Sequence, residues 1–193
     1  MKRMSIGRGV ILAVCLSIMG PTPIRVYAAG PTPLGPIPSG CPLGPAPRFI
    51  PSLTMDAVGS APVWAVGFRP NELLHIGGDY PGLPFAHGWA VKIPWVEHRG
   101  YAGLVTIRAW TWPRRQPVWF TGRTQGPLPY LRLDGRRPTL LPPLYDPRHP
   151  RHVMPNPAWQ GFSSDMYIPR ASCYVMEASW PGGTWRLHFA AGQ

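Results

Sequence analysis

The chain has 193 residues, with 19 Lys and Arg against 8 Asp and Glu, and a formal net charge of +11 at pH 7. This length fits one globular domain plus an extended segment. The basic residues stand singly or in pairs, mostly beside Pro or Gly, and not along one helix face or element, which argues against a nucleic-acid-binding protein. Attraction to anionic envelope polymers or lipid head groups stays open.

Residues 1–28 have the pattern of an export signal. Three basic residues precede an apolar run at 10–19, and small residues precede the expected cleavage after Ala28. The run is about half of the ~20 residues that a transmembrane helix needs, so retention as a membrane anchor is the alternative. Cleavage removes Lys2, Arg3, Arg8 and Arg25 and lowers the net charge from +11 to +7. We therefore predict an extracellular or cell-envelope protein.

Residues 29–51 hold eight prolines and four glycines in 23 positions. Proline has no N–H for a sheet ladder, so this segment is predicted to be an extended arm. A spacer role is favoured over a proline-motif ligand. The predicted division is signal peptide 1–28, arm 29–51 and β-sandwich 52–193.

Two cysteines remain after cleavage, because Cys15 lies within the signal. An even pair in an oxidising compartment predicts a disulfide between Cys41 and Cys173. The alternatives are free or differently paired thiols, and a lipid anchor on Cys41. Ser39 and Gly40 precede Cys41 as in a lipobox, but Pro38 stands where an aliphatic residue is expected.

The rest of the chain has the pattern of short strands between Pro/Gly turns, with no uninterrupted helical period. Strands are expected at 62–67, 73–76, 88–98, 104–111, 118–120, 130–133, 173–180 and 184–190. The prediction is an all-β, immunoglobulin-like antiparallel β-sandwich with helices short or absent. Residues 136–157 contain seven prolines and are predicted to form a long surface loop.

Alternation assigns the faces of the predicted strands. In the strand at 88–98, Trp89, Val91, Ile93 and Trp95 share the core side, and Pro94 indicates an edge or a bulge. In the strand at 104–111, Val105, Ile107 and Ala109 face the core, which turns Thr106, Arg108, Trp110 and Trp112 outward.

The turn Trp180-Pro181-Gly182-Gly183 joins the last two predicted strands. A tight register pairs Ala178 with Trp185, Met176 with Leu187 and Tyr174 with Phe189 on the apolar face, and Glu177 with Arg186 on the outer face. The alternative is a four-residue loop, which shifts the register by two residues and keeps the same faces. Cys173 falls on this outer side. The arm that carries Cys41 is therefore expected to cross the outer face or an end of the sheet.

Four segments carry a resemblance to a known group: PVWAVGF at 62–68, GWAVKIPW at 88–95, IPRASCY at 168–174 and WPGG at 180–183. Together they resemble uncharacterised secreted or lipoprotein-like β-sandwich proteins of Gram-positive-type bacteria. The resemblance spans residues 59–193. Ser172 replaces the glycine that precedes the cysteine in those proteins. It implies an immunoglobulin-like fold and an envelope or extracellular location, and no activity.

Asp146, His149 and His152 are the candidate metal ligands, because a carboxylate and two imidazoles at this spacing suit zinc or copper. The prolines and arginines among them favour the alternative of a solvated basic loop. His75, His87, His98 and His188 stand alone in the sequence. No hydrolase, zincin, Walker or dinucleotide motif is present, so we expect neither an enzyme nor a cofactor.

Arg108, Trp110, Trp112 and Trp119 are the candidate binding residues, as an exposed aromatic and cationic patch. The alternative is that the arm or the 136–157 loop covers these tryptophans. We predict a secreted or envelope-associated binding or structural module without catalytic activity. A cell-wall polymer, a glycan or an envelope protein is the expected partner, and a membrane only if the signal is retained.

Overall fold

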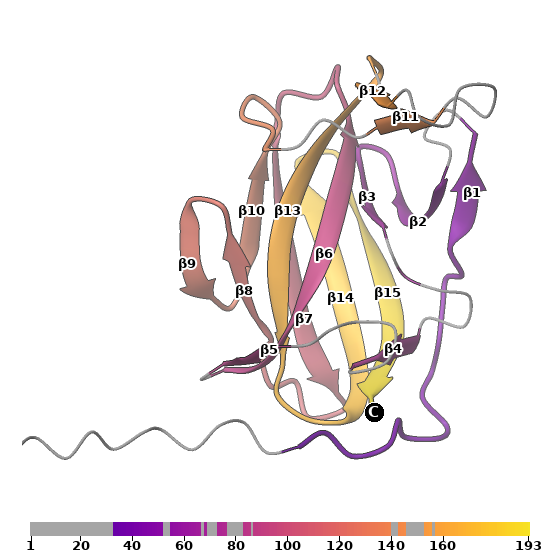
Figure 1. Cartoon of the computed structure of the whole chain (residues 1–193), viewed down its shortest axis with the longest axis vertical. Coiled ribbons are helices and arrows are strands. Elements are labelled where there is room, and N and C mark those ends of the chain that lie inside the picture. Colours follow the sequence, from indigo (N-terminus) through magenta and orange to yellow (C-terminus); the bar gives the residue numbers. More distant parts are fainter. Residues whose placement is uncertain are drawn as a thin grey trace, which may run out of the picture.

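The computed structural model describes residues 33–51, 55–66, 68, 73–76, 83–85, 87–139, 143–145, 153–155 and 157–193. These residues form fifteen β-strands and no α-helix. Two sheets pack face to face, so the predicted immunoglobulin-like β-sandwich is confirmed (Figure 1). In the described part of the chain, no helix is long and apolar enough to span a membrane. The predicted signal, residues 1–28, lies outside the described residues.

The first sheet is centred on the antiparallel pair β6 (Gly88–His98) and β13 (Trp159–Ile168), which are in register along all of β13. Its order is β1 (Arg48–Ile50), β2 (Met55–Ser60), β3 (Val63–Val66), β6, β13, β8 (Trp119–Gly122) and β9 (Gln125–Leu128), with β5 (Leu83–Phe85) also paired to β6. β13 pairs with one edge of β6. Along the other edge, residues up to Ala90 pair with β5, and residues from Trp95 onward pair with β3. Pro94 occupies that gap, which explains how a proline fits in a central strand.

The second sheet has the order β10 (Leu131–Asp134), β7 (Leu104–Trp112), β14 (Ser172–Trp180), β15 (Gly183–Gly192) and β4 (Leu73–His75). All of its pairs are antiparallel except β15 with β4. A third pair, β11 (Pro143–Tyr145) with β12 (Val153–Pro155), lies inside the predicted 136–157 loop. The expectation of a continuous loop is therefore corrected there.

The core lies between the two sheets, and the chain crosses from one sheet to the other at β6 to β7 and again at β13 to β14 (Figure 1). Most of the predicted inward residues of β6 and β7 are buried, among them Val91, Ile93, Trp95, Val105 and Ile107, whereas Trp89 is partly buried and packs against this core. Burying each such side chain contributes about 1.5–3 kcal/mol relative to leaving it in water. This shared core holds the outer faces of both sheets rigid.

The C-terminal hairpin has the predicted register. Ala178 pairs with Trp185, Met176 with Leu187 and Tyr174 with Phe189, and all six side chains are buried. On the opposite face the Nε of Arg186 donates to Oε2 of Glu177 at 2.6 Å. The apolar alternation predicted the faces, and of the two registers that keep these faces the structure has the tight one.

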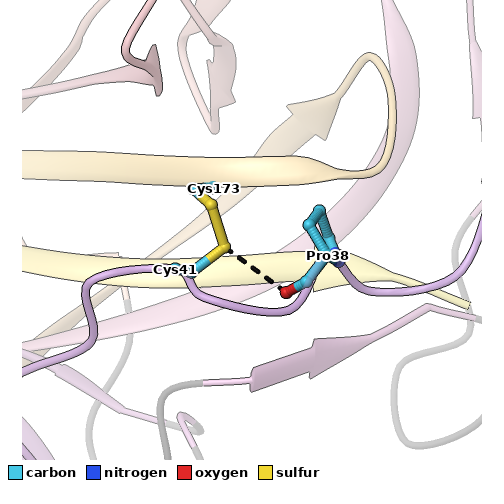
Figure 2. The surroundings of a disulfide bond; sticks show 3 residues. All are labelled: Pro38, Cys41 and Cys173. Carbon is cyan, nitrogen blue, oxygen red and sulfur yellow. Dashed lines mark hydrogen bonds between the residues drawn. A yellow bond between two sulfur atoms is a disulfide. The ribbon is translucent and has the colours of Figure 1, made fainter.

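The arm is joined to β14 by the predicted disulfide. Cys41 and Cys173 are bonded, with their Cα atoms 5.4 Å apart (Figure 2). The Sγ of Cys41 lies 3.6 Å from the carbonyl oxygen of Pro38. Three residues after Cys41, the N–H of Gly44 donates to the carbonyl of His188, and the N–H of His188 donates to the carbonyl of Gly44. The arm is therefore joined to the outer side of β14 at Cys173, as predicted, and then pairs with the edge of β15 away from β14 at His188.

The described part of the arm is packed on the folded body. Leu34 is buried in the core cluster, and the N–H of Gln193 donates to the carbonyl of Gly35 at 2.9 Å. The arm passes the C-terminal end of β15 and continues into β1 of the first sheet (Figure 1). The expectation that residues 29–51 cannot join a sheet is thus wrong for Arg48–Ile50, which lie between two prolines and keep their own N–H groups.

Candidate functional site

The candidate site lies on the outer face of the second sheet, where β7, β14 and β15 are in register. Three rows of side chains follow from the strand pairings. They are Trp112–Cys173–Ala190, Trp110–Val175–His188 and Arg108–Glu177–Arg186. Alternate residues of a strand share a face, so the buried set Val105, Ile107 and Ala109 fixes the outward direction of this array.

The middle of the array is a groove of about 400 Å³. Residues of the three strands and of the neighbouring turns line it. They are Arg108, Ala109, Trp110, Trp112, Arg115, Pro117, Pro129, Val175, Glu177, Arg186 and His188. We call it the outer-face groove. It brings together three of the four residues that the sequence predicted for binding.

The two tryptophans of the outer-face groove differ in exposure. Trp112 is 43% exposed, and Trp110 is half-buried. The ring of His188 approaches Trp112 edge-on, with 6.2 Å between centroids. Within the described residues, Nδ1 of His188 is buried and has no hydrogen-bond partner. The groove therefore offers an aromatic surface, while Nδ1 of His188 is shielded from solvent beneath it.

Of the three arginines in the groove, Arg186 is the one with a side-chain partner among the described residues. Glu177 lies between Arg108 on β7 and Arg186 on β15, and its carboxylate accepts from Arg186. Within the part of the chain that the structure describes, the side chain of Arg108 forms no ion pair or hydrogen bond. An arginine with unused donors beside an aromatic surface suits a carboxylate or phosphate ligand.

One rim of the groove is the turn after β7. Thr111 holds it closed: its carbonyl accepts from the N–H of Arg115 at 2.8 Å, and its Oγ1 accepts from the N–H of Gln116 at 3.1 Å. Arg115 has a φ of 56°, a left-handed conformation uncommon outside glycine. The Nη2 of Arg170 donates to the side chain of Gln116 at 2.7 Å. These contacts fix Arg115 at the groove although the turn is exposed.

Trp119 does not belong to this groove, and its inclusion in the patch is corrected. The chain pairs with β7 through residues 117 and 118 and then passes to the first sheet at β8. There the ring of Trp119 stacks on His87 at 4.5 Å between centroids. The change of sheet within one residue of Val118 could not be read from alternation.

A second groove of about 380 Å³ opens between the β8–β9 hairpin and β10, and we call it the edge groove. Three exposed arginines line it: Arg123, Arg132 and Arg137. Its other polar residues include Tyr130, Asp134, Thr139 and Ser163. Arg132 lies over the ring of Tyr130 at 5.2 Å. Oδ1 of Asp134 accepts from the N–H of Arg136 at 3.1 Å, so this carboxylate is engaged in a turn.

A buried carboxylate, Glu97, lies at one end of the sandwich. Its Oε2 accepts from Nε2 of Gln160 at 2.8 Å, while Oε1 has no partner among the described residues. The same Nε2 also lies 2.8 Å from the carbonyl of Gly135 and 3.2 Å from that of Tyr101. Burial raises the pKa of Glu97 to about 7, with a smaller opposing effect of the Gln160 bond. This cluster opens on neither groove, and we treat it as structural.

The candidate metal ligands Asp146, His149 and His152 lie outside the described residues, so this site stays a prediction. Within the described ranges, no group of three His, Cys, Asp or Glu side chains is close enough to hold a metal ion. Of the lone histidines, His87 and His98 stack on tryptophans, Trp119 and Trp159 respectively.

Sequence reasoning placed Glu177 and Arg186 on the outer face without assigning them to a site, and among the other lining residues it missed Arg115, Pro117, Pro129 and His188. His188 lies on the same outer face as Arg186 by simple alternation along β15, so the predicted hairpin register already contained that signal. The other three come from turns. Their approach to β7 depends on tertiary contacts that no local pattern carries.

Comparison with protein-family models and with curated proteins finds no match. Among solved structures, the chain is similar to the ASH/PapD-like domain of human CEP192 (PapD-like domain 7), with 14% identity and a TM-score of 0.24. The match covers 82% of this chain and 97% of that domain.

Proposed function

We propose that this protein is an exported, non-catalytic binding module, and that its outer-face groove binds a saccharide of the cell envelope. The observation that carries the proposal is the exposed Trp112 beside Trp110 in a groove that also holds Arg108, whose side chain has no partner among the described residues. Apolar faces of sugar rings pack on aromatic side chains, while arginine donors bind the hydroxyl or acidic groups around them.

An extracytoplasmic location is supported by two independent features. The first is the export-signal pattern of residues 1–28. The second is the bond between Cys41 and Cys173, because disulfides persist mainly in oxidising compartments. A rigid sheet face presented outside the cell is a suitable support for recognition of an envelope polymer.

Binding is favoured over hydrolysis by the composition of the groove. Glycoside hydrolases ordinarily use two carboxyl groups that flank the scissile bond. Among the described residues that line the outer-face groove, Glu177 is the single carboxylate, and Arg186 holds it at 2.6 Å. A carboxylate held in this way is poorly suited to act as a general acid.

The proposal is tested by tryptophan fluorescence on titration with neutral and acidic envelope saccharides. Binding should shift the emission of the wild-type protein, and Trp112→Ala should abolish the shift. Trp119→Ala, which alters a half-buried tryptophan of the other sheet, is the matched control and should leave binding intact. A shift retained in Trp112→Ala, or lost equally in both variants, would contradict the proposal.

A further inference from the structure

We infer that the preferred ligand is a linear polyanion, an acidic polysaccharide, which runs from the outer-face groove across β10 into the edge groove. This inference rests on the proposed function and extends it to a second subsite and a ligand class. The two grooves meet at consecutive residues, because Pro129 lines the outer-face groove and Tyr130 lines the edge groove.

A line of arginines connects the two grooves. Thr106 of β7 pairs with Arg132 of β10, and Arg108 lies two residues further along the same face of β7. Arg108 and Arg132 are therefore diagonal neighbours on adjacent strands, and the Cα atoms of such neighbours lie about 7–8 Å apart. Arg186 extends the line on the other side of Glu177. A chain laid across these strands would meet Arg186 with its paired Glu177, then Arg108 and then Arg132.

The edge groove completes a cationic path. It contributes Arg123, Arg132 and Arg137, and the single carboxylate of its described lining, Asp134, accepts from a backbone N–H of its own turn. The side chains of Arg123 and Arg137 are exposed and form no hydrogen bond or ion pair within the described residues. Among the described residues nothing occupies their donors, and arginine binds carboxylate or phosphate groups through two parallel hydrogen bonds.

The floor and rim of the edge groove suit a saccharide chain. Thr139 and Ser163 add hydroxyl groups, and Tyr130 adds an aromatic ring on which Arg132 is already positioned. Such a mixture of aromatic, hydroxyl and guanidinium groups matches a polymer that alternates sugar rings with negative charges.

The test compares a long and a short acidic saccharide by isothermal titration calorimetry. Polygalacturonate and its trimer provide carboxylates, teichoic acid provides phosphates and dextran is the neutral polymer. Wild type should bind both polyanions more tightly than the trimer and should not bind dextran. Arg123→Gln/Arg137→Gln should weaken polymer binding at least about tenfold and leave trimer binding unchanged. Arg48→Gln/Arg99→Gln, two exposed arginines outside both grooves, is the control of equal charge.

The outcomes separate the two proposals. Polymer affinity that is equal in Arg123→Gln/Arg137→Gln and in the Arg48/Arg99 control overturns the extended path, as does tight binding of dextran. Trimer binding that survives Trp112→Ala overturns the outer-face groove itself. A wild-type protein that binds neither polyanion overturns the polyanion inference, and one that also binds no neutral envelope saccharide overturns both proposals. Preference for teichoic acid or for polygalacturonate identifies the source of the negative charge.

Discussion

Gln160 of β13 donates its side-chain amide to the carboxylate of Glu97 on β6, and the two residues are direct cross-strand partners. Both side chains are buried, with Glu97 fully shielded from solvent. Burial favours the neutral carboxylic acid over the charged carboxylate, and it raises the pKa of Glu97 from 4.5 to about 7.

This pair predicts a stability that decreases as pH rises. Because the folded-state pKa exceeds the unfolded value of 4.5, the contribution of Glu97 is fully present below pH 4.5 and is lost as pH rises through about 7. The free energy of unfolding should fall by about 3 kcal/mol over this window. Glu97→Gln should flatten the curve and stabilise the protein at pH 8. Urea denaturation between pH 4.5 and 8 measures both, and an equally steep curve for the variant would refute this assignment.

The disulfide predicts a stability that depends on redox state. Cys41 and Cys173 are separated by 132 residues, so their bond restricts the unfolded chain strongly. Cys41→Ser/Cys173→Ser should lower the free energy of unfolding by about 2–5 kcal/mol. Addition of a reductant should shift the wild-type denaturation midpoint and leave that of the variant unchanged. A wild-type midpoint that is insensitive to reduction would show that the bond is absent or unimportant.

The arm packs closely against the C-terminal strand at Gly192. A Cβ there would lie 2.7 Å from the backbone nitrogen of Ile37 and 2.9 Å from the carbonyl oxygen of Gly35. Gly192→Ala should therefore displace the arm and destabilise the protein by about 1–3 kcal/mol. Gly126→Ala is the control, because nothing lies within 4 Å of its Cβ position. Thermal denaturation measures both variants, and an equal change in melting temperature would mean that the arm is not packed as described.

Ser164 predicts a cost for removing a buried hydrogen bond. Nε1 of Trp95 donates to its hydroxyl at 2.8 Å, and the hydroxyl in turn donates to the carbonyl of Ile93 at 3.3 Å. Ser164→Ala should leave the indole N–H unsatisfied and cost about 1–3 kcal/mol. The neighbouring Ser163→Ala removes a hydroxyl on the opposite face and should stay within about 0.5 kcal/mol of wild type. Chemical denaturation of both variants decides the point.

The same residues explain what the sequence could and could not predict. β6, β7 and the C-terminal hairpin have apolar alternation on their core faces, and their positions and faces were predicted. β13 is as central, yet it was missed, because Gln160 and Ser164 on its core face break the pattern. Their partners Glu97 and Trp95 lie more than 60 residues away, so the polar groups become compatible with a core only once the sheet exists.

The binding site shows a similar division. Alternation along β7 was sufficient to predict that Arg108, Trp110 and Trp112 share one face, and the structure places them in one groove. Trp119 was assigned to the same patch because it is close in sequence, but the chain changes sheet just before it. The edge groove escaped prediction altogether, since it is assembled from β8, β9, β10 and residues of β13.

The most direct test of the outer-face groove is the indole region of a ¹H–¹⁵N spectrum during titration with an acidic saccharide such as galacturonate trimer. Of the nine tryptophans, Trp112 and Trp110 should shift most. Trp95 and Trp185 should remain in place, because their indole N–H groups donate inside the protein to Ser164 and to the carbonyl of Val63. Shifts confined to Trp64 or Trp119, or no shift at saturating ligand, would contradict the proposed site.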